Sequence, residues 1–275
     1  MAISDADWKL LADLFHTRFG LVFEGIRRSF LEPRLAPRLR ELRLASYREY
    51  YHYLLFHPQR EAELGQLKVL LTNNETYFFR EDHQLTLLAQ HIVPALMREL
   101  ETRPLRILSA GCSSGEEAYS IVITLQNAGL ELRGVNWQVD ACDLNPRRLA
   151  TAREGVYDAN SMRGVPPDVR ARHFDEHDGK FTLKARHKKG VRFFEANLVD
   201  PAAGVGWGPY DVIFCRNVLI YFSDSSFDAV ISALARCLTP GGYLLLGHSE
   251  SLIDRRADFT PACIDGSIVY RKAGR

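Results

Sequence analysis

The stretch Leu105–Glu117 reads LRILSAGCSSGEE and decides the fold of this chain. Its first half, Leu105–Ala110, has the length and the apolar side chains of a buried strand. Gly111–Gly115 follows as a turn of small residues, and Glu116 and Glu117 stand where a helix would begin. A strand, a tight turn and a helix in this order predict the first unit of a parallel α/β sheet.

The chain after this stretch alternates in the same way between short apolar runs and helical stretches. This order predicts a doubly wound α/β domain with a parallel sheet, and Asp265-Gly266 predicts a hairpin that closes the sheet with antiparallel strands. The segment between the expected strands at 137–142 and 191–195 of the main sheet is longer than one crossover helix requires. It implies a small inserted β-subdomain at about 160–192. The expected strands are 105–110, 137–142, 180–185, 191–195, 210–215, 243–247 and two within 259–272.

The part of the chain before this domain carries helical patterns. Ser4 begins a capping box, apolar residues follow at helical spacing, and Gly20 marks the end of the first helix. Ser46 begins another helix in the same way, and a further helix is expected at about 59–71. We therefore expect a helical N-terminal domain at 1–75, a linker with a bridging helix at 76–103, and the α/β domain at 104–275.

Composition excludes several classes of protein. The 275 residues are 46% hydrophobic and 25% charged, and the net charge of +1 gives no overall field that would attract nucleic acid. No apolar run is long enough to cross a bilayer and the first residues show no secretory signal, so we expect a cytoplasmic protein without membrane insertion. The five cysteines and nine histidines match no metal-ligand spacing, and we expect no metal.

The residues that follow the strands indicate the site, because ligands of open α/β sheets bind beyond the carboxyl ends of the strands. Glu116 and Glu117 would repel a pyrophosphate at the helix N-terminus, and the turn has no P-loop lysine, which disfavours a phosphate cofactor. A cofactor with positive charge would suit the two acids. The alternative is that they only complement the helix dipole.

Asp143 follows the second expected strand, where nucleoside-binding α/β domains place an acid that accepts both ribose hydroxyls. A compatible alternative is that Asp143 caps the helix that begins near Pro146. A ribose-binding acid and an acidic turn unsuited to phosphate together describe S-adenosylmethionine. This cofactor has an adenosine, a sulfonium and an α-amino group, and it has no phosphate.

Five linked motifs resemble those of the chemotaxis-receptor glutamate methyltransferases, the CheR family, over nearly the whole chain. They are TNNETYFFRE at 72–81, SSGEEAYS at 113–120, NL at 197–198, FCRNVLIYF at 214–222 and GHSE at 247–250. The resemblance implies a helical N-terminal domain before a methyltransferase sheet with an inserted β-subdomain. It also implies S-adenosylmethionine as cofactor, S-adenosylhomocysteine as its product, and glutamate side chains of receptor helices as methyl acceptors.

The same resemblance implies roles for individual residues. Arg80 and Tyr221 would face the methyl-transfer centre, although on the residues alone Tyr221 could equally belong to an apolar turn. The residues that would contact the cofactor are Asn74, Thr76, Arg80, Glu117, Asp143, Asn197, Leu198, Arg216 and Asn217.

The sequence after Cys215 bears on the methyl acceptor. Enzymes that methylate amino groups commonly have Asn/Asp-Pro-Pro-aromatic at this point, whereas Arg216-Asn217-Val218 follows here. A glutamate carboxyl group has a pKa of about 4.3, so at neutral pH it is ionised and needs no general base. We expect an in-line displacement that the protein accelerates by positioning the reactants and excluding water.

A basic cluster lies at 27–48, with seven arginines against two glutamates. If the partner is the acidic methylation region of a chemoreceptor, the cluster would bind it. A solvated helix surface is the alternative, and nucleic acid is disfavoured because no stacking aromatics are interleaved. Pro33 and Pro37 interrupt the expected helix, so Pro37 should start a new helix or kink this one. The proposed substrate-binding residues are Arg34, Arg38, Arg40 and Arg43.

Phe174–Phe181 lacks the longer Gly-rich loop with which some family members hold a C-terminal pentapeptide tether of the receptor. We therefore expect methylation that does not depend on a tether. Two other interpretations stay open. One is a catalytically silent module that binds the cofactor and docks on a partner, and the other is a methyltransferase that acts on a small molecule or RNA.

Overall fold

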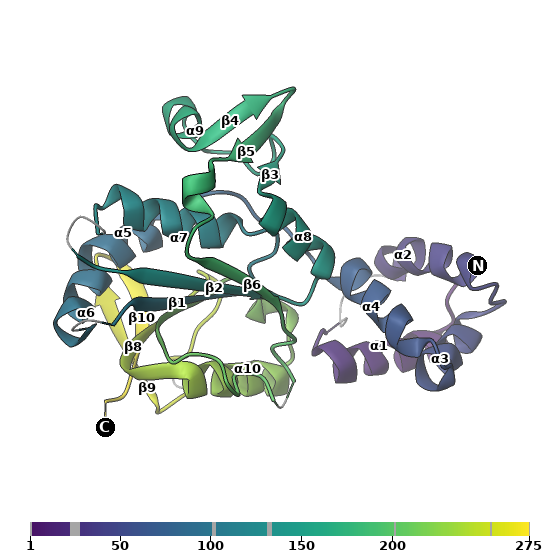
Figure 1. Ribbon diagram of the computed structural model, residues 1–275. Coiled ribbons are helices and arrows are strands. Elements are labelled where there is room, and N and C mark those ends of the chain that lie inside the picture. Colours follow the sequence, from purple (N-terminus) through teal and green to yellow (C-terminus); the bar gives the residue numbers. More distant parts are fainter. Residues whose placement is uncertain are drawn as a thin grey trace. The chain divides into compact units, whose positions relative to one another are not determined.

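The computed structural model describes residues 2–22, 28–100, 103–130, 134–200, 202–253 and 255–274 (Figure 1). The chain forms two compact units. The first consists of Met1–Asn73 and Tyr221–Asp228, and the second of Asn74–Ile220 and Ala229–Arg275. Within the described residues, no helix has both the length and the apolar character that crossing a membrane requires.

The first unit contains four helices within the described residues, and serine side chains cap the N-termini of two of them. The four helices are α1 (Asp5–Phe19), α2 (Arg28–Glu41), α3 (Tyr47–Phe56) and α4 (Arg60–Leu71). The Ser4 side chain accepts a hydrogen bond from the Asp7 N–H, and Gly20 ends α1 at a φ of 73°, which glycine adopts without strain. Ser46 caps α3 through the N–H of Glu49. The predictions of α1, α3 and α4 are confirmed.

Helix α2 continues through both of its prolines. The expectation that Pro37 starts a new helix is wrong, because a single helix contains Pro33 and Pro37. Leu31, Leu35 and Leu39 recur at four-residue spacing and are at most 4% exposed. The burial of this row of leucines stabilises the helical path despite the backbone hydrogen bonds that the two prolines cannot donate. Arg27 and the side chain of residue 28 lie outside the described part of the chain.

The second unit is built on a seven-stranded sheet of order β6-β2-β1-β7-β8-β10-β9. The first five strands in this order are parallel, and β10 pairs antiparallel with both β8 and β9. This confirms the doubly wound sheet and its closing hairpin. The strands are β1 (Leu105–Ala110), β2 (Trp137–Asp143), β6 (Val191–Glu195), β7 (Tyr210–Cys215), β8 (Leu238–Leu246), β9 (Phe259–Ile264) and β10 (Ser267–Lys272).

Strand β8 begins earlier than the expected 243–247. Leu238 pairs with Tyr210, the register then shifts, and pairing resumes where Tyr243 faces Val212. The apolar run that predicted the strand is therefore its regular part. The irregular residues before it contain Pro240, which has no N–H to donate to a neighbouring strand.

Helices cover both faces of this sheet. Figure 1 shows α7 and α8 on one face and α10 on the other. Every residue of β7 is buried, as a strand in the middle of a two-sided core requires. The helices are α5 (Asp82–Leu87), the π-helical turn η1 (Leu88–Ile92), α6 (Val93–Leu100), α7 (Glu116–Asn127), α8 (Pro146–Glu154) and α10 (Asp224–Cys237).

The inserted β-subdomain is a separate three-stranded sheet of order β3-β5-β4 in which neighbouring strands are antiparallel. Its expected strand at 180–185 is β5, which ends two residues earlier. The Phe78 ring packs edge-on against Tyr157 and Phe174 with 4.8 Å between ring centroids, which anchors the subdomain to the segment before α5. The elements are β3 (Val156–Tyr157), α9 (Pro167–His173), β4 (Phe174–His177), β5 (Lys180–Leu183) and the 3-10 turn η3 (Ala185–His187).

Candidate functional site

The order of strands creates a topological switch point between β1 and β7. From β1 the chain passes to β2 on one side, while β7 pairs with β1 on the other side. The loops that follow β1 and β7 therefore lead away from each other and leave a crevice at the carboxyl ends of these strands. Gly111–Gly115 follows β1 and Arg216-Asn217 follows β7, so both segments border this crevice.

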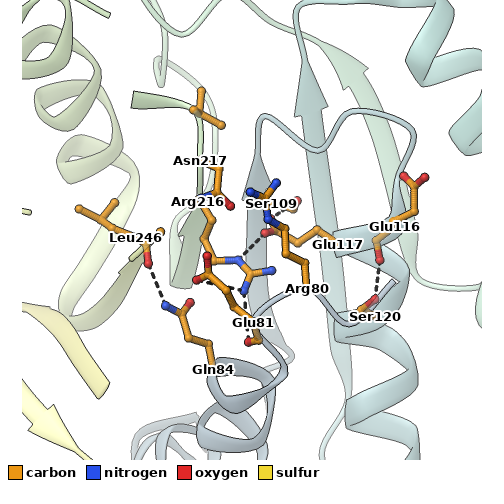
Figure 2. Close-up of polar contacts among 12 residues, drawn as sticks. Arg80, Glu81, Gln84, Ser109, Glu116, Glu117, Ser120, Arg216, Asn217 and Leu246 are labelled. Carbon is orange, nitrogen blue, oxygen red and sulfur yellow. Dashed lines mark hydrogen bonds and ion pairs between the residues drawn. The ribbon is translucent and has the colours of Figure 1, made fainter. Parts of the chain in front are cut away.

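Glu117 lies at this crevice in the first turn of α7. Its Oε2 accepts a hydrogen bond from Nε of Arg216 and its Oε1 accepts one from the hydroxyl of Ser109, each at 2.7 Å (Figure 2). The side chains of Arg216 and Glu117 are 3% and 13% exposed, so the ion pair is largely withdrawn from water. Each carboxylate oxygen has two lone pairs, so each keeps an acceptor position for a further donor.

Glu116 has a different environment from its neighbour. It is 1% exposed, and its Oε1 accepts the hydroxyls of Ser114 at 3.0 Å and Ser161 at 2.8 Å. Burial raises the pKa of Glu116 above its ordinary value, although these hydroxyl bonds favour the ionised form. Glu116 and Glu117 are adjacent in the sequence, but their side chains therefore have different partners. Glu117 meets Arg216 at the crevice, and Glu116 connects the turn to the segment between β3 and α9 of the β-subdomain.

Asp143 ends β2 and joins the loops after β1 and β2. Its Oδ2 accepts the Ser113 N–H at 2.7 Å and its Oδ1 accepts the Asn145 N–H at 2.8 Å. The N-cap of α8 is Asn145, which accepts from the N–H groups of Arg147 and Arg148, so the alternative that Asp143 caps this helix is wrong. Burial raises the pKa of Asp143, and the two amides oppose this rise because they stabilise the ionised form.

Two other sequence-predicted segments meet the same edge of the sheet. The carbonyl of Asn74 accepts the Ser113 hydroxyl at 3.3 Å, and its side-chain oxygen accepts from Nδ2 of Asn145 at 3.3 Å. Thr76 lies two residues after Asn74 and is half-buried. On the β6 side, Ala196 donates its N–H to the Asp143 carbonyl at 3.0 Å, which brings the following Asn197-Leu198 to the end of β2.

Arg216 also faces Glu81 at the start of α5. Its NH1 donates to the Glu81 carbonyl at 3.4 Å and lies 3.9 Å from Oε2 of that carboxylate, whose Oε1 is 3.1 Å from Nδ1 of His248. Burial acts to raise the pKa of Glu81, but the contacts with His248 and Arg216 outweigh it and lower that pKa below its ordinary value. The guanidinium of Arg216 is therefore held between two carboxylates, those of Glu117 and Glu81.

The loop after β7 folds around the carboxylate of Glu250, which is 7% exposed. Five backbone N–H groups donate to its two oxygens at 2.7 to 3.3 Å, those of Asn217, Val218, Leu219, Ile220 and Gly247. Asn217 has a φ of 58°, in the left-handed region that asparagine tolerates better than most residues. Glu250 thus fixes the backbone that presents Arg216 to Glu117.

The two residues predicted to face the methyl-transfer centre, Arg80 and Tyr221, belong to different units. Arg80 donates to the Glu75 carbonyl at 3.2 Å and its guanidinium lies 5.7 Å from the centre of the Tyr77 ring. Tyr221 belongs to the first unit, where its hydroxyl accepts from Nδ2 of Asn73 at 2.7 Å. Their convergence on a transferring methyl group stays a prediction.

The predicted substrate-binding arginines differ in their surroundings. Arg38 is part of an internal network, because its Nε donates to Glu63 at 2.9 Å and the Tyr50 hydroxyl donates to the same carboxylate at 2.6 Å. Arg40 and Arg43 are exposed, whereas Arg34 is half-buried. A structural role therefore accounts for Arg38, and the exposed pair is better placed to meet a partner.

Sequence reasoning gave no role to Glu81, Ser109 or Glu250, although all three take part in this site. Ser109 is a fully buried hydroxyl in an otherwise largely apolar strand, and such a polar residue in a strand is a detectable signal. Glu250 lies within the GHSE motif, but its five amide donors could not be assigned, because four of them lie more than 29 residues earlier in the chain.

The fold and the site define an S-adenosylmethionine-dependent methyltransferase. The acidic, lysine-free turn and the acceptor positions left on Glu117 fit the cofactor's ammonium group and its lack of phosphate. Residues 74–266 match the family model "CheR methyltransferase, SAM binding domain", and residues 6–72 match "CheR methyltransferase, all-alpha domain". The chain belongs to the CheR methyltransferase family.

Three curated relatives illustrate this membership. The chain is 38% identical over 253 residues to chemotaxis protein methyltransferase 2 of Vibrio cholerae, covering 92% of this chain and 88% of that one. It is 34% identical over 274 residues to the chemotaxis protein methyltransferase of Escherichia coli, covering 98% and 92%. It is 36% identical over 259 residues to the probable biofilm formation methyltransferase WspC of Pseudomonas aeruginosa, covering 94% and 60%.

Proposed function

We propose that this protein methylates glutamate side-chain carboxylates of chemoreceptors or related signalling proteins and produces glutamate methyl esters. The observation that carries the proposal is the loop after β7, where Arg216 pairs with Glu117 in place of an Asn/Asp-Pro-Pro-aromatic turn that would grip a planar nitrogen. Membership of the CheR family and relatives named chemotaxis protein methyltransferase support the same substrate class.

Binding of the cofactor is assigned to residues that border the crevice. Glu117 would accept the ammonium group through its remaining lone pairs, and Asp143 would accept the ribose hydroxyls. Asn74, Thr76, Asn197 and Leu198 would line the nucleoside side, and Arg216 and Asn217 the amino-acid side. When bound, the cofactor supplies an electrophilic methyl group on its sulfonium.

The chain has to orient the acceptor and exclude water, because an ionised carboxylate needs no base. The guanidinium of Arg80 uses one of its five N–H donors on the Glu75 carbonyl, and we assign other donors to orienting the incoming carboxylate. The Tyr221 hydroxyl would direct the approaching oxygen. The two residues together would then restrict the acceptor to an in-line approach.

Recognition of the partner is assigned to exposed arginines of the first unit, in particular Arg40 and Arg43. A two-residue turn, Asp178-Gly179, joins β4 and β5, with φ values of 48° and 71°. Such a tight turn offers no long loop for a tether, which supports methylation without a pentapeptide. The reaction is assigned to the cytoplasm.

The test is incubation of the protein with cofactor labelled in the methyl group and with candidate receptor cytoplasmic fragments. We expect label that mild alkali releases as methanol and that maps to glutamate. Label that resists alkali and maps to lysine, arginine or RNA would contradict the proposal. Binding of cofactor without methylation of any receptor offered would favour the silent docking module instead.

A variant of Tyr221 separates chemistry from binding. Tyr221→Phe keeps the ring and removes one hydroxyl, so the affinity for cofactor should change by no more than a few-fold while kcat falls about ten-fold or more. Thermal unfolding of the variant controls for the lost hydrogen bond with Asn73. An unchanged kcat would leave this tyrosine with a packing role only.

A further inference from the structure

A cavity of about 690 Å³ lies in the second unit at the junction of the β-subdomain with the main sheet. Gln126 at the end of α7 and Trp137 at the start of β2 form one side. Arg172, Arg186 and Lys189 of the inserted segment form the other side. None of the residues that line this cavity, which we call the basic cavity, is acidic.

The basic cavity is remote from the crevice that holds Glu117. Helix α7 has 12 residues, and Glu117 lies in its first turn while Gln126 lies in its last. At a rise of about 1.5 Å per residue the helix is about 18 Å long. The cavity therefore lies near the opposite end of α7 from the methyl-transfer crevice and is a second place for a ligand.

Two buried histidines line the basic cavity. His173 and His187 are 2% and 1% exposed, and the pKa of each falls to about 4. Burial is the main cause, and repulsion from the neighbouring cations adds to it. The cations that repel the pair are Arg172, Lys184 and Arg186. Asp168 lies 4.0 Å from Arg172 and Asp175 lies 3.8 Å from Lys184, so Arg186 and Lys189 are the cavity cations without an acidic partner in the described contacts. An anion would lower the electrostatic energy of this cluster.

A chain of hydrogen bonds fixes the cation nearest the histidines. Nε2 of Gln126 donates to the Arg186 carbonyl at 3.3 Å, so the amide oxygen faces Nδ1 of His187, which donates to it at 2.5 Å. Nε2 of His187 is then unprotonated and accepts from Nε of Arg186 at 3.2 Å and from Nδ1 of His173 at 3.1 Å. NH2 of Arg186 donates to the Arg172 carbonyl at 2.6 Å. The guanidinium is held in place before any ligand arrives, which favours binding.

Trp137 adds an apolar wall to the basic cavity. A Cβ atom at Gly190, which also lines the cavity, would come within 2.8 Å of the Trp137 ring, so the ring lies against a bare backbone. Within the described part of the chain, Nε1 of Trp137 is buried and makes no hydrogen bond.

We propose that the basic cavity binds a small ligand through a phosphate group, either an inorganic phosphate or the phosphate of a nucleotide. The cations supply the charge, the fixed guanidinium supplies directed donors, and the Trp137 ring can cover an attached base. This site takes a class of ligand that the acidic crevice excludes. The proposal of a phosphate site does not depend on which methyl acceptor the protein uses.

The test is isothermal titration of the full chain with inorganic pyrophosphate and, separately, with guanosine 5′-diphosphate. Saturating S-adenosylhomocysteine is present throughout, which occupies the cofactor site. We expect binding of at least one probe, weakened by added salt. Tighter binding of the nucleotide would identify a nucleotide site, and equal affinities would identify an inorganic phosphate site.

The matched variants are Lys189→Glu, which changes the cavity, and Lys180→Glu, which makes the same change in charge at the hairpin of the β-subdomain. Both lysines are exposed, so neither variant should unfold the protein. Lys189→Glu should weaken binding about ten-fold or more, and Lys180→Glu by less than about two-fold. Absence of binding by both probes at millimolar concentration, or equal effects of the two variants, would overturn the proposal.

Discussion

Replacement of Glu250 by glutamine tests whether one carboxylate holds the loop that presents Arg216. The wild-type carboxylate accepts five backbone N–H groups, three on Oε1 and two on Oε2. The glutamine amide keeps the shape but has only one oxygen, so in its better orientation it keeps the three bonds of Oε1. The N–H groups of Asn217 and Gly247 then face an NH₂ group that cannot accept.

The expected loss follows from these two orphaned donors. A buried donor left unpaired costs about 1–3 kcal/mol, so Glu250→Gln should lower the free energy of unfolding by about 2–6 kcal/mol. Because the loop carries Arg216, we also expect the affinity for S-adenosylhomocysteine to fall by about ten-fold, or 1.4 kcal/mol.

Urea denaturation followed by circular dichroism measures the first effect, and isothermal titration below the unfolding transition measures the second. Glu176→Gln is the matched control, because Glu176 is exposed on β4 and its neutralisation should change the free energy of unfolding by no more than about 0.5 kcal/mol. If Glu250→Gln unfolds at the same urea concentration as this control, the carboxylate does not hold the loop and the reasoning is refuted.

Three further predictions concern other parts of the molecule. Asp143→Ala should weaken both S-adenosylmethionine and S-adenosylhomocysteine by about 1.5–3 kcal/mol in calorimetry, and unchanged affinities would place the ribose elsewhere. The double variant Arg40→Glu, Arg43→Glu should raise the receptor KM and leave cofactor affinity unchanged, and added salt should mimic it in the wild type; a salt-independent KM would make these arginines solvated surface. Because the pKa of His173 and of His187 is about 4 in the fold and 6.5 in the unfolded chain, stability should be full above pH 6.5 and decrease by a few kcal/mol as the pH falls to about 4. Urea midpoints measured across this range, with a His173→Gln, His187→Gln variant as the comparison, would contradict the third prediction if both proteins lost stability equally.

The sequence by itself determined the elements whose signals are local. Strands β1 and β7 lie at the residues that their apolar runs predict, because a strand buried on both faces needs a continuous apolar run. Strand β6 also has its predicted bounds, although it is an edge strand without a buried residue. Helix α1 has the boundaries that Ser4 and Gly20 predict, since a cap acts on the N–H and carbonyl groups of its own turn. The linked motifs predicted the family for a similar reason, because each is a short contiguous run that can be recognised without knowledge of its surroundings.

Only the tertiary structure decided which charged groups meet. Glu116 and Glu117 are adjacent in the sequence and separate in space, because successive helix positions point about 100° apart and reach different neighbours. Arg38 belongs to a basic helix and was predicted to bind the substrate, yet its partner Glu63 lies 25 residues away in the sequence and could not be assigned from it. The five donors of Glu250 come together only when the ends of β7 and β8 lie side by side. Propensity and spacing describe a residue's own turn or strand, whereas the burial of a charge depends on distant partners that only packing brings close.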